Sequence, residues 1–169
     1  MATRRLGGIA TSSSVPDNGG DNSGGGGGSA GGYVDDVFST YVYAGNAAAR
    51  DIENGVDLAG EGGMAWIKSR TNTGYHFLFD TERGAEKALS SELPDTEMSR
   101  SGSLTAFNNS GFSVGSFASS NGSDQDYVSW TFRKAPKFFD CVTYTGNGVV
   151  GREIPHNLGC ELGMVIVKS

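Results

Sequence analysis

The chain has 169 residues, of which 13 are basic and 19 acidic, so its formal net charge is −6. This balance argues against a nucleic-acid surface, which needs a basic stripe to neutralise phosphates. No apolar run approaches the ~20 residues that a membrane-spanning helix needs, and no signal peptide is evident.

Residues 1–32 form a glycine-rich arm. Nine of the fourteen residues from 19 to 32 are glycine, and nothing there can bury apolar area against the entropy of ordering. In isolation the arm should be a flexible coil, so we expect neighbouring proteins of a large assembly to hold it, with Arg4, Arg5 and Leu6 as anchoring contacts. The alternatives are an arm that folds back on its own domain and a phosphate loop, which the missing Gly-Lys-Ser/Thr ending disfavours.

Residues 33–136 read as short strands separated by polar turns. The β-branched and aromatic runs are at 37–43, 64–68, 75–79, 104–107, 111–114 and 127–132. In the last run, Val128, Trp130 and Phe132 face one way and the intervening residues the other, which is typical of a half-buried antiparallel strand. Only residues 83–93 could hold a helical turn or two. This pattern predicts an all-β fold, an antiparallel β-sandwich or jelly roll.

The aromatic side chains divide into two predicted groups. Strand faces need large apolar side chains for packing, so we assign one group to the core rather than to a sugar-stacking platform. The predicted core aromatics are Trp66, Trp130, Phe77, Phe79 and Phe132. The better candidates for exposed glycan contact are Tyr33, Tyr41 and Tyr75.

One motif series occurs twice. Tyr-x-Gly-Asn stands at 43–46 and at 144–147, and Gly-Met-x-x-x-Lys-Ser stands at 63–69 and at 163–169. The spacing of about a hundred residues is that of a small domain. We therefore predict one repeat at 33–136 and the opening of a second, incomplete repeat at 137–169.

Several of these runs together resemble a known module. They are Tyr-Val-Asp-Asp-Val-Phe-Ser-Thr-Tyr-Val-Tyr, Phe-Asp-Thr-Glu-Arg-Gly-Ala, Leu-Thr-Ala-Phe-Asn-Asn-Ser-Gly-Phe and, most specific, Tyr-Val-Ser-Trp-Thr-Phe-Arg-Lys-Ala-Pro-Lys-Phe-Phe-Asp. The series is similar to a tandem repeat module of bacteriophage virion proteins, common in marine phages and associated with tail fibres and appendages. The resemblance covers residues 33–169 and implies concanavalin-A-like sandwiches. Since half a sandwich would expose a raw sheet edge, we expect the natural chain to continue past Ser169.

Two motifs look catalytic, and we interpret both as structural. Gly-x-Ser-x-Gly around Ser113 fits the nucleophile elbow, but a turn precedes it and no helix pattern follows. Asp51 and Glu53 resemble the alternating carboxylates of sandwich-fold glycosidases, but Ala49 stands where that pattern needs another acid. We expect no catalytic residue.

The candidate metal ligands and thiols are also read as structural. The acidic clusters at 35–36 and 123–126 could offer oxygen ligands to calcium, but they lack EF-hand spacing and fit solvated turns. His76 has no Cys/His cluster beside it, so we expect a surface or satisfied histidine. Cys141 and Cys160 could pair, although a reduced origin is simpler. An ion pair within 80–83 should lie on a loop and be worth little. We expect no metal and no cofactor.

The resulting expectation is a structural protein of the bacteriophage virion, made in the host cytoplasm. The arm would dock into a tail adaptor or nozzle or into the capsid, and the sandwiches would project as a fibre for host attachment. By analogy with fibres, a homotrimer is expected. The alternatives are a capsid decoration or head-fibre protein, a carbohydrate-binding module that holds a host surface glycan and, least favoured, a glycan-cleaving enzyme.

Overall fold

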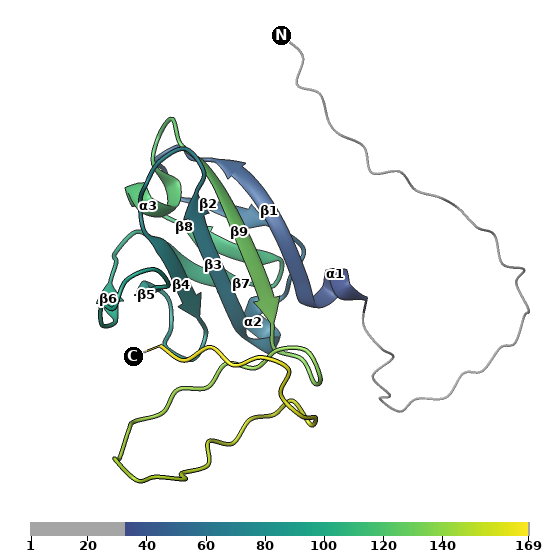
Figure 1. Ribbon diagram of the computed structural model, residues 1–169. Coiled ribbons are helices and arrows are strands. Elements are labelled where there is room, and N and C mark those ends of the chain that lie inside the picture. The colour runs from purple at the N-terminus through teal and green to yellow at the C-terminus, as the bar shows by residue number, and fades with distance from the viewer. Residues whose placement is uncertain (1–32, 169) are drawn as a thin grey trace, which may run out of the picture. The chain divides into compact units, whose positions relative to one another are not determined.

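The computed structural model describes residues 33–168, which carry two antiparallel sheets (Figure 1). In spatial order, the six-stranded sheet consists of β1 (Phe38–Ala44), β9 (Asp126–Arg133), β3 (Gly63–Ser69), β4 (His76–Asp80), β5 (Lys87–Ser90) and β6 (Met98–Ser99). The three-stranded sheet consists of β2 (Arg50–Glu53), β8 (Gly111–Val114) and β7 (Leu104–Asn108). The predicted all-β, β-sandwich-like fold is confirmed. The predicted arm, with Arg4, Arg5 and Leu6, lies outside the described residues.

Helical structure in the described region is limited to three four-residue turns: α1 (Val34–Val37), α2 (Leu58–Glu61) and α3 (Ala118–Asn121). The prediction of helix within residues 83–93 is wrong. Ala88 and Ser90 in this stretch are fully buried and alternate with partly buried neighbours, so the segment forms β5 against the core. None of the helices seen between residues 33 and 168 has the length and apolar character to cross a bilayer.

β9 is the strand on which the large sheet is built. It pairs antiparallel with β1 along one edge and with β3 along the other, each over seven residues. β1 in turn stands at the outer edge of this sheet. The side chains of Tyr127, Ser129 and Thr131 are fully buried between the sheets, whereas Trp130 and Phe132 point to the opposite face and stay partly exposed. The predicted alternation is confirmed.

The hydrophobic core lies between the two sheets. Its fully buried bulky members are Tyr127, Phe77, Phe79, Phe112, Leu58, Ile67, Leu104, Val56 and Val114. The core assignment is therefore confirmed for Phe77 and Phe79. It is wrong for Trp66, Trp130 and Phe132, which lie outside this cluster on the outward face of the large sheet. These three rings alternate along β3 and β9 with buried residues, and the pairing of β3 with β4 and β9 therefore puts them all on the outward face.

The Tyr-x-Gly-Asn motif at 43–46 ties the end of β1 to α3. The Tyr43 hydroxyl donates to the carbonyl oxygen of Ser120 at 2.8 Å, and its ring stacks on Tyr127 at 5.3 Å between centroids. Burial, with Tyr127 beside it, raises the pKa of Tyr43, so the hydroxyl remains a donor. Gly45 admits no side chain, because a Cβ there would lie 2.0 Å from the carbonyl oxygen of Gly122.

Asn121 completes this attachment from the α3 side. It is fully buried, and its Nδ2 donates to the carbonyl oxygens of Ala48 and Gly115, each at 2.7 Å. Its Oδ1 accepts the backbone N–H of Asn46 at 3.2 Å, while Asn46 Oδ1 lies 3.0 Å from Asn121 Nδ2. One side chain thus satisfies polar groups of two loops that are far apart in sequence, the one after β1 and the one between β8 and α3.

Residues 140–168 contain no strand, although the runs at 138–144 and 163–169 are the sequence counterparts of the first-copy runs that form β1 and β3. Tyr144 and Ile166 in these runs are 50% and 66% exposed. A strand needs a partner for its backbone groups. The first-copy counterparts, β1 and β3, both pair with β9, and this pairing occupies both edges of β9. No edge of β9 is left for the second pair of runs.

Replacing Asn121 by alanine tests this attachment. The change removes the donor of the buried Gly115 carbonyl and of the carbonyl of Ala48, which is an exposed residue, so we expect the free energy of unfolding to fall by about 1–3 kcal/mol. The matched control is Asn147→Ala, since Asn147 is the exposed counterpart of Asn46 and bonds only locally, to the Val149 N–H. It should change stability by less than about 0.5 kcal/mol. Urea unfolding followed by circular dichroism measures both, and equal losses would contradict this role of Asn121.

Candidate functional site

Two indoles lie side by side on the outward face of the large sheet. Trp66 of β3 stands opposite Trp130 of β9, and their ring centroids are 5.6 Å apart with an interplanar angle of 59°. Phe132 follows two residues after Trp130 and therefore points the same way. Two-residue periodicity on adjacent strands thus produces an aromatic cluster on the face away from the core.

Lys68 and His76 extend the cluster along the same face. Lys68 lies opposite Val128 of β9 and His76 of β4, so all three project outward in one row across the sheet. The Lys68 ammonium donates to the carbonyl oxygens of Ser69 and, at 3.1 Å, Asn72, which holds the head group beside the turn that follows β3. The predicted outward placement of His76 is confirmed.

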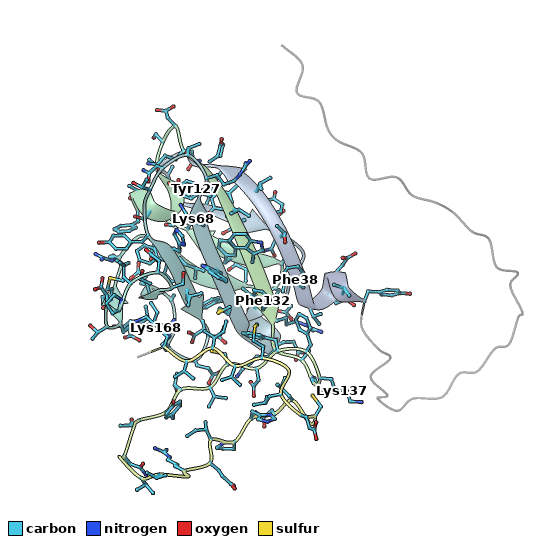
Figure 2. The ribbon with its side chains drawn as sticks, viewed as in Figure 1. Phe38, Lys68, Tyr127, Phe132, Lys137 and Lys168 are labelled. Carbon is cyan, nitrogen blue, oxygen red and sulfur yellow. The ribbon has the colours of Figure 1, made fainter. Side chains whose placement is uncertain are left out.

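Together these five residues line an open groove, which we call the tryptophan groove. It has a volume of about 300 Å³ and is lined by Trp66, Lys68, His76, Trp130 and Phe132. Figure 2 labels Lys68 toward one end of the sheet and Phe132 toward the other. The floor is aromatic, and the Lys68 and His76 side chains supply nitrogen atoms. Such a mixture suits a ligand that is flat and apolar on one side and polar at its rim.

The three predicted glycan-contact tyrosines lie apart from this groove. Tyr33 is 83% exposed at the start of α1. Tyr41 is 38% exposed on the edge strand β1, opposite Ser129 of β9. Tyr75 is 36% exposed and stacks on Phe77 at 5.3 Å. They come from three separate elements, and their role in glycan contact stays a prediction.

A second cluster joins the end of β9 to the segment that follows. Lys134 bonds to Glu82 and lies 3.6 Å from the carboxylate of Asp140. Burial alone would lower the pKa of Lys134, but the bond to Glu82 and the charge of Asp140 outweigh it and raise the pKa. Asp140 also accepts the backbone N–H of Asn157 at 2.7 Å. Residues 134–157 are thereby held to the end of the sandwich.

Beside this cluster, the ion pair predicted within 80–83 exists, but it is not an exposed loop pair. The Asp80 and Arg83 side chains are only 6% and 11% exposed, and the two charged groups approach to 2.6 Å. Arg83 also donates to the carbonyl oxygen of Leu78 at 2.9 Å. A pair removed from water with extra hydrogen bonds is costly to break from one side. The predicted exposed setting is therefore wrong, since Asp80 closes β4 and both side chains are largely buried.

The catalytic-looking motifs stand in ordinary strand positions. Ser113 lies within β8, not in a strand-to-helix turn, and its hydroxyl donates to Asp51 Oδ1 at 2.5 Å and accepts from Asn108 at 3.0 Å. Asp51 and Glu53 are exposed on β2. In the described part of the chain, no group of three or more His, Cys, Asp and Glu side chains is placed to hold a metal ion.

Comparison with known proteins yields a family but no function. A model of a domain of unknown function (DUF7483) matches residues 34–169. No curated protein and no solved structure matches the chain. The match spans the described sandwich and the segment after it, so the tryptophan groove and the Lys134 cluster both lie within the family domain.

Thiol labelling tests whether residues 134–143 stay docked. Cys141 is partly buried, and burial, reinforced by the charge of Asp80, raises its pKa to about 12, whereas Cys160 is exposed. At mildly alkaline pH an aromatic disulfide reagent should therefore modify one thiol per chain quickly and Cys141 only slowly.

The Phe139→Ala variant removes the ring that packs 5.4 Å from Phe132, and it should make Cys141 react at least about tenfold faster. The control is Val150→Ala, at a side chain that is 99% exposed. Equal, rapid reaction of both thiols in the unaltered chain would show that this segment is not docked.

Proposed function

Since the chain belongs to the DUF7483 family, whose name assigns no activity, we propose a function from its architecture: it is a structural protein of a bacteriophage virion. In this proposal it forms the N-terminal part of a tail fibre or appendage. The arm at 1–32 docks into a neighbouring virion protein, and concanavalin-A-like sandwiches in series project outward for host attachment. The observation that supports the proposal is that the side-chain contacts of the Tyr-x-Gly-Asn loop at 43–46 recur in the loop at 144–147, after β9.

The clearest recurrence is an arginine stacked on the tyrosine of the repeated motif. The guanidinium of Arg50 lies 5.4 Å from the ring centre of Tyr43, and that of Arg152 lies 5.8 Å from Tyr144. Each guanidinium also donates to the carbonyl oxygen of the residue that follows the tyrosine. The same two contacts therefore appear about one domain length apart.

The asparagine of the motif also repeats its local bond. Asn46 Oδ1 accepts the N–H of Ala48 at 3.0 Å, and Asn147 Oδ1 accepts the N–H of Val149 at 3.1 Å. Such side-chain turns form from neighbouring residues alone. They explain how the loop of the second copy adopts the conformation of the first without a sheet around it.

The two copies meet at Phe132. Phe38 N–H donates to the Val34 carbonyl in α1, and Phe139 N–H donates to the Ala135 carbonyl at 3.2 Å, so the same turn precedes both phenylalanines. The Phe38 and Phe139 rings lie 5.0 Å and 5.4 Å from Phe132. A shared aromatic contact and the Lys134–Asp140 pair favour a stiff joint between modules, which suits a projecting fibre.

The remaining parts of the proposal follow from fibre architecture. Arg4, Arg5 and Leu6 are the proposed contacts of the arm with a tail adaptor or nozzle, and several associated copies, a trimer by analogy, would compensate for weak single contacts. The protein would be made in the host cytoplasm and act in the virion, by binding rather than catalysis. A capsid decoration or head-fibre protein would use the same arm on a different neighbour.

A carbohydrate-binding module is the second candidate function. The tryptophan groove favours it, because two partly exposed indoles on a rigid sheet are costly to keep in water unless a ligand or partner uses them. The two functions are compatible, since fibres attach to host surfaces.

Deleting residues 1–32 tests the anchoring role. We expect the truncated chain to keep the circular dichroism and urea midpoint of the full chain, because the core formed by the described residues begins at Tyr43 and is complete in the sandwich that remains. Incorporation into phage particles should fall below about a tenth of the full-length level, as expected when a principal binding segment is lost. A control with Arg50→Lys keeps the arm and should be incorporated normally. Normal incorporation of the truncated chain would show that the arm is only a linker.

A further inference from the structure

We infer that the tryptophan groove is a glycan subsite, in which Trp66 and Trp130 receive the apolar face of a pyranose ring. This inference deepens the attachment function proposed above, on which it depends only for the source of the glycan. It places sugar contact on β3 and β9 rather than on Tyr33, Tyr41 and Tyr75.

The two indoles are held by β3 and β9, which are both paired along their two edges. The residues that alternate with them, Ala65, Ile67, Ser129 and Thr131, are all fully buried, so neither strand can rotate without opening the core. The indoles therefore need little ordering when a ligand binds. A binding surface that is already in place loses less affinity to conformational entropy.

The chemistry of the groove matches that of a sugar. A pyranose ring presents C–H groups on one face and hydroxyl groups around its rim, so it needs an aromatic floor with polar groups at the edge. Trp66, Trp130 and Phe132 provide the floor. Lys68 uses two of its three N–H donors on backbone carbonyls, and its third donor has no partner among residues 33–168. His76 adds a ring nitrogen that can donate or accept.

The size of the groove argues against a protein partner. Five residues line it, whereas a stable protein interface engages about 20–30 residues on each side. Its volume of about 300 Å³ is at the small end of the range for small-molecule sites. The net charge of −6, with Lys68 as the one lysine or arginine among the five residues that line the groove, also disfavours a nucleic-acid base as the stacking ligand.

The chain provides its own reporter, because Trp66 and Trp130 are its only tryptophans. The full chain is first screened on an array of bacterial surface and plant polysaccharide fragments. It is then titrated with the soluble oligosaccharides that bind, while tryptophan emission and its quenching by acrylamide are followed. We expect binding to at least one sugar class, with protection of the indoles from acrylamide at saturation.

Variants locate the site. Trp66→Ala and Trp130→Ala should each weaken the affinity about tenfold or more, as expected for loss of one stacking ring. Tyr33→Ala changes an exposed tyrosine that does not line the groove, and it should leave the affinity for the sugar unchanged. Should an alanine variant unfold, Trp66→Phe and Trp130→Phe keep an aromatic floor and leave a single indole, and that indole should still be protected by the sugar.

Three results would overturn the inference: no glycan on the array binds, binding persists in both tryptophan variants, or the indoles become protected only as the protein concentration is raised without sugar. The last result would identify the face as a contact between copies. Failure here is distinguishable from failure of the anchoring role, because the chain lacking residues 1–32 should bind the same sugars with unchanged affinity.

Discussion

The pairing of β9 with both β1 and β3 is the constraint from which the rest of the domain follows. Trp130 lies between Thr40 and Trp66, and Phe132 lies between Phe38 and Met64. One register therefore decides the inward and the outward face together. A slip of a single residue would bring the indoles into the core and turn the buried side chains outward. The tryptophan groove and the hydrophobic core therefore lie on opposite faces of strands that the same backbone hydrogen bonds hold in register.

The strands and the sandwich could be predicted from the sequence because alternation and turn residues are local signals. The hairpin of β7 and β8 about Asn108 is an example. Which face of β9 is buried could not be predicted in this way. Trp130 is more apolar than Ser129 or Thr131, so hydropathy alone assigns the wrong side. The buried hydroxyl of Thr131 is satisfied by Asn54 at 2.7 Å, a contact 77 positions away in the chain.

A better signal for the groove lay in the neighbouring strand. β3 alternates between Ala65 and Ile67 on one side and Trp66 and Lys68 on the other, and a lysine is seldom buried. The face shared with Lys68 is therefore the outward one, and antiparallel pairing then carries Trp130 to the same side. Recognising this requires the strand order β9-β3, which no short-range pattern contains.

The segment after β9 shows which structural features form from neighbouring residues alone and which need a distant partner. Its arginine–tyrosine stack and asparagine turn match those of the first copy, since residues a few positions apart supply all the atoms. The strands do not form within the described residues, where β1 and β3 already pair with both edges of β9. Contacts between neighbouring residues therefore suffice to set this loop without a sheet around it.

The place of β1 at the edge of the large sheet bears on how copies behave at high concentration. Its seven residues, Phe38–Ala44, include no charged residue and no proline, the two features that usually block a free edge. Among the described strands, nothing covers its outer backbone groups. Mutual repulsion from the net charge of −6 then opposes edge-to-edge pairing. Salt screens that repulsion, so colloidal stability of this chain should depend on ionic strength as much as on the fold itself.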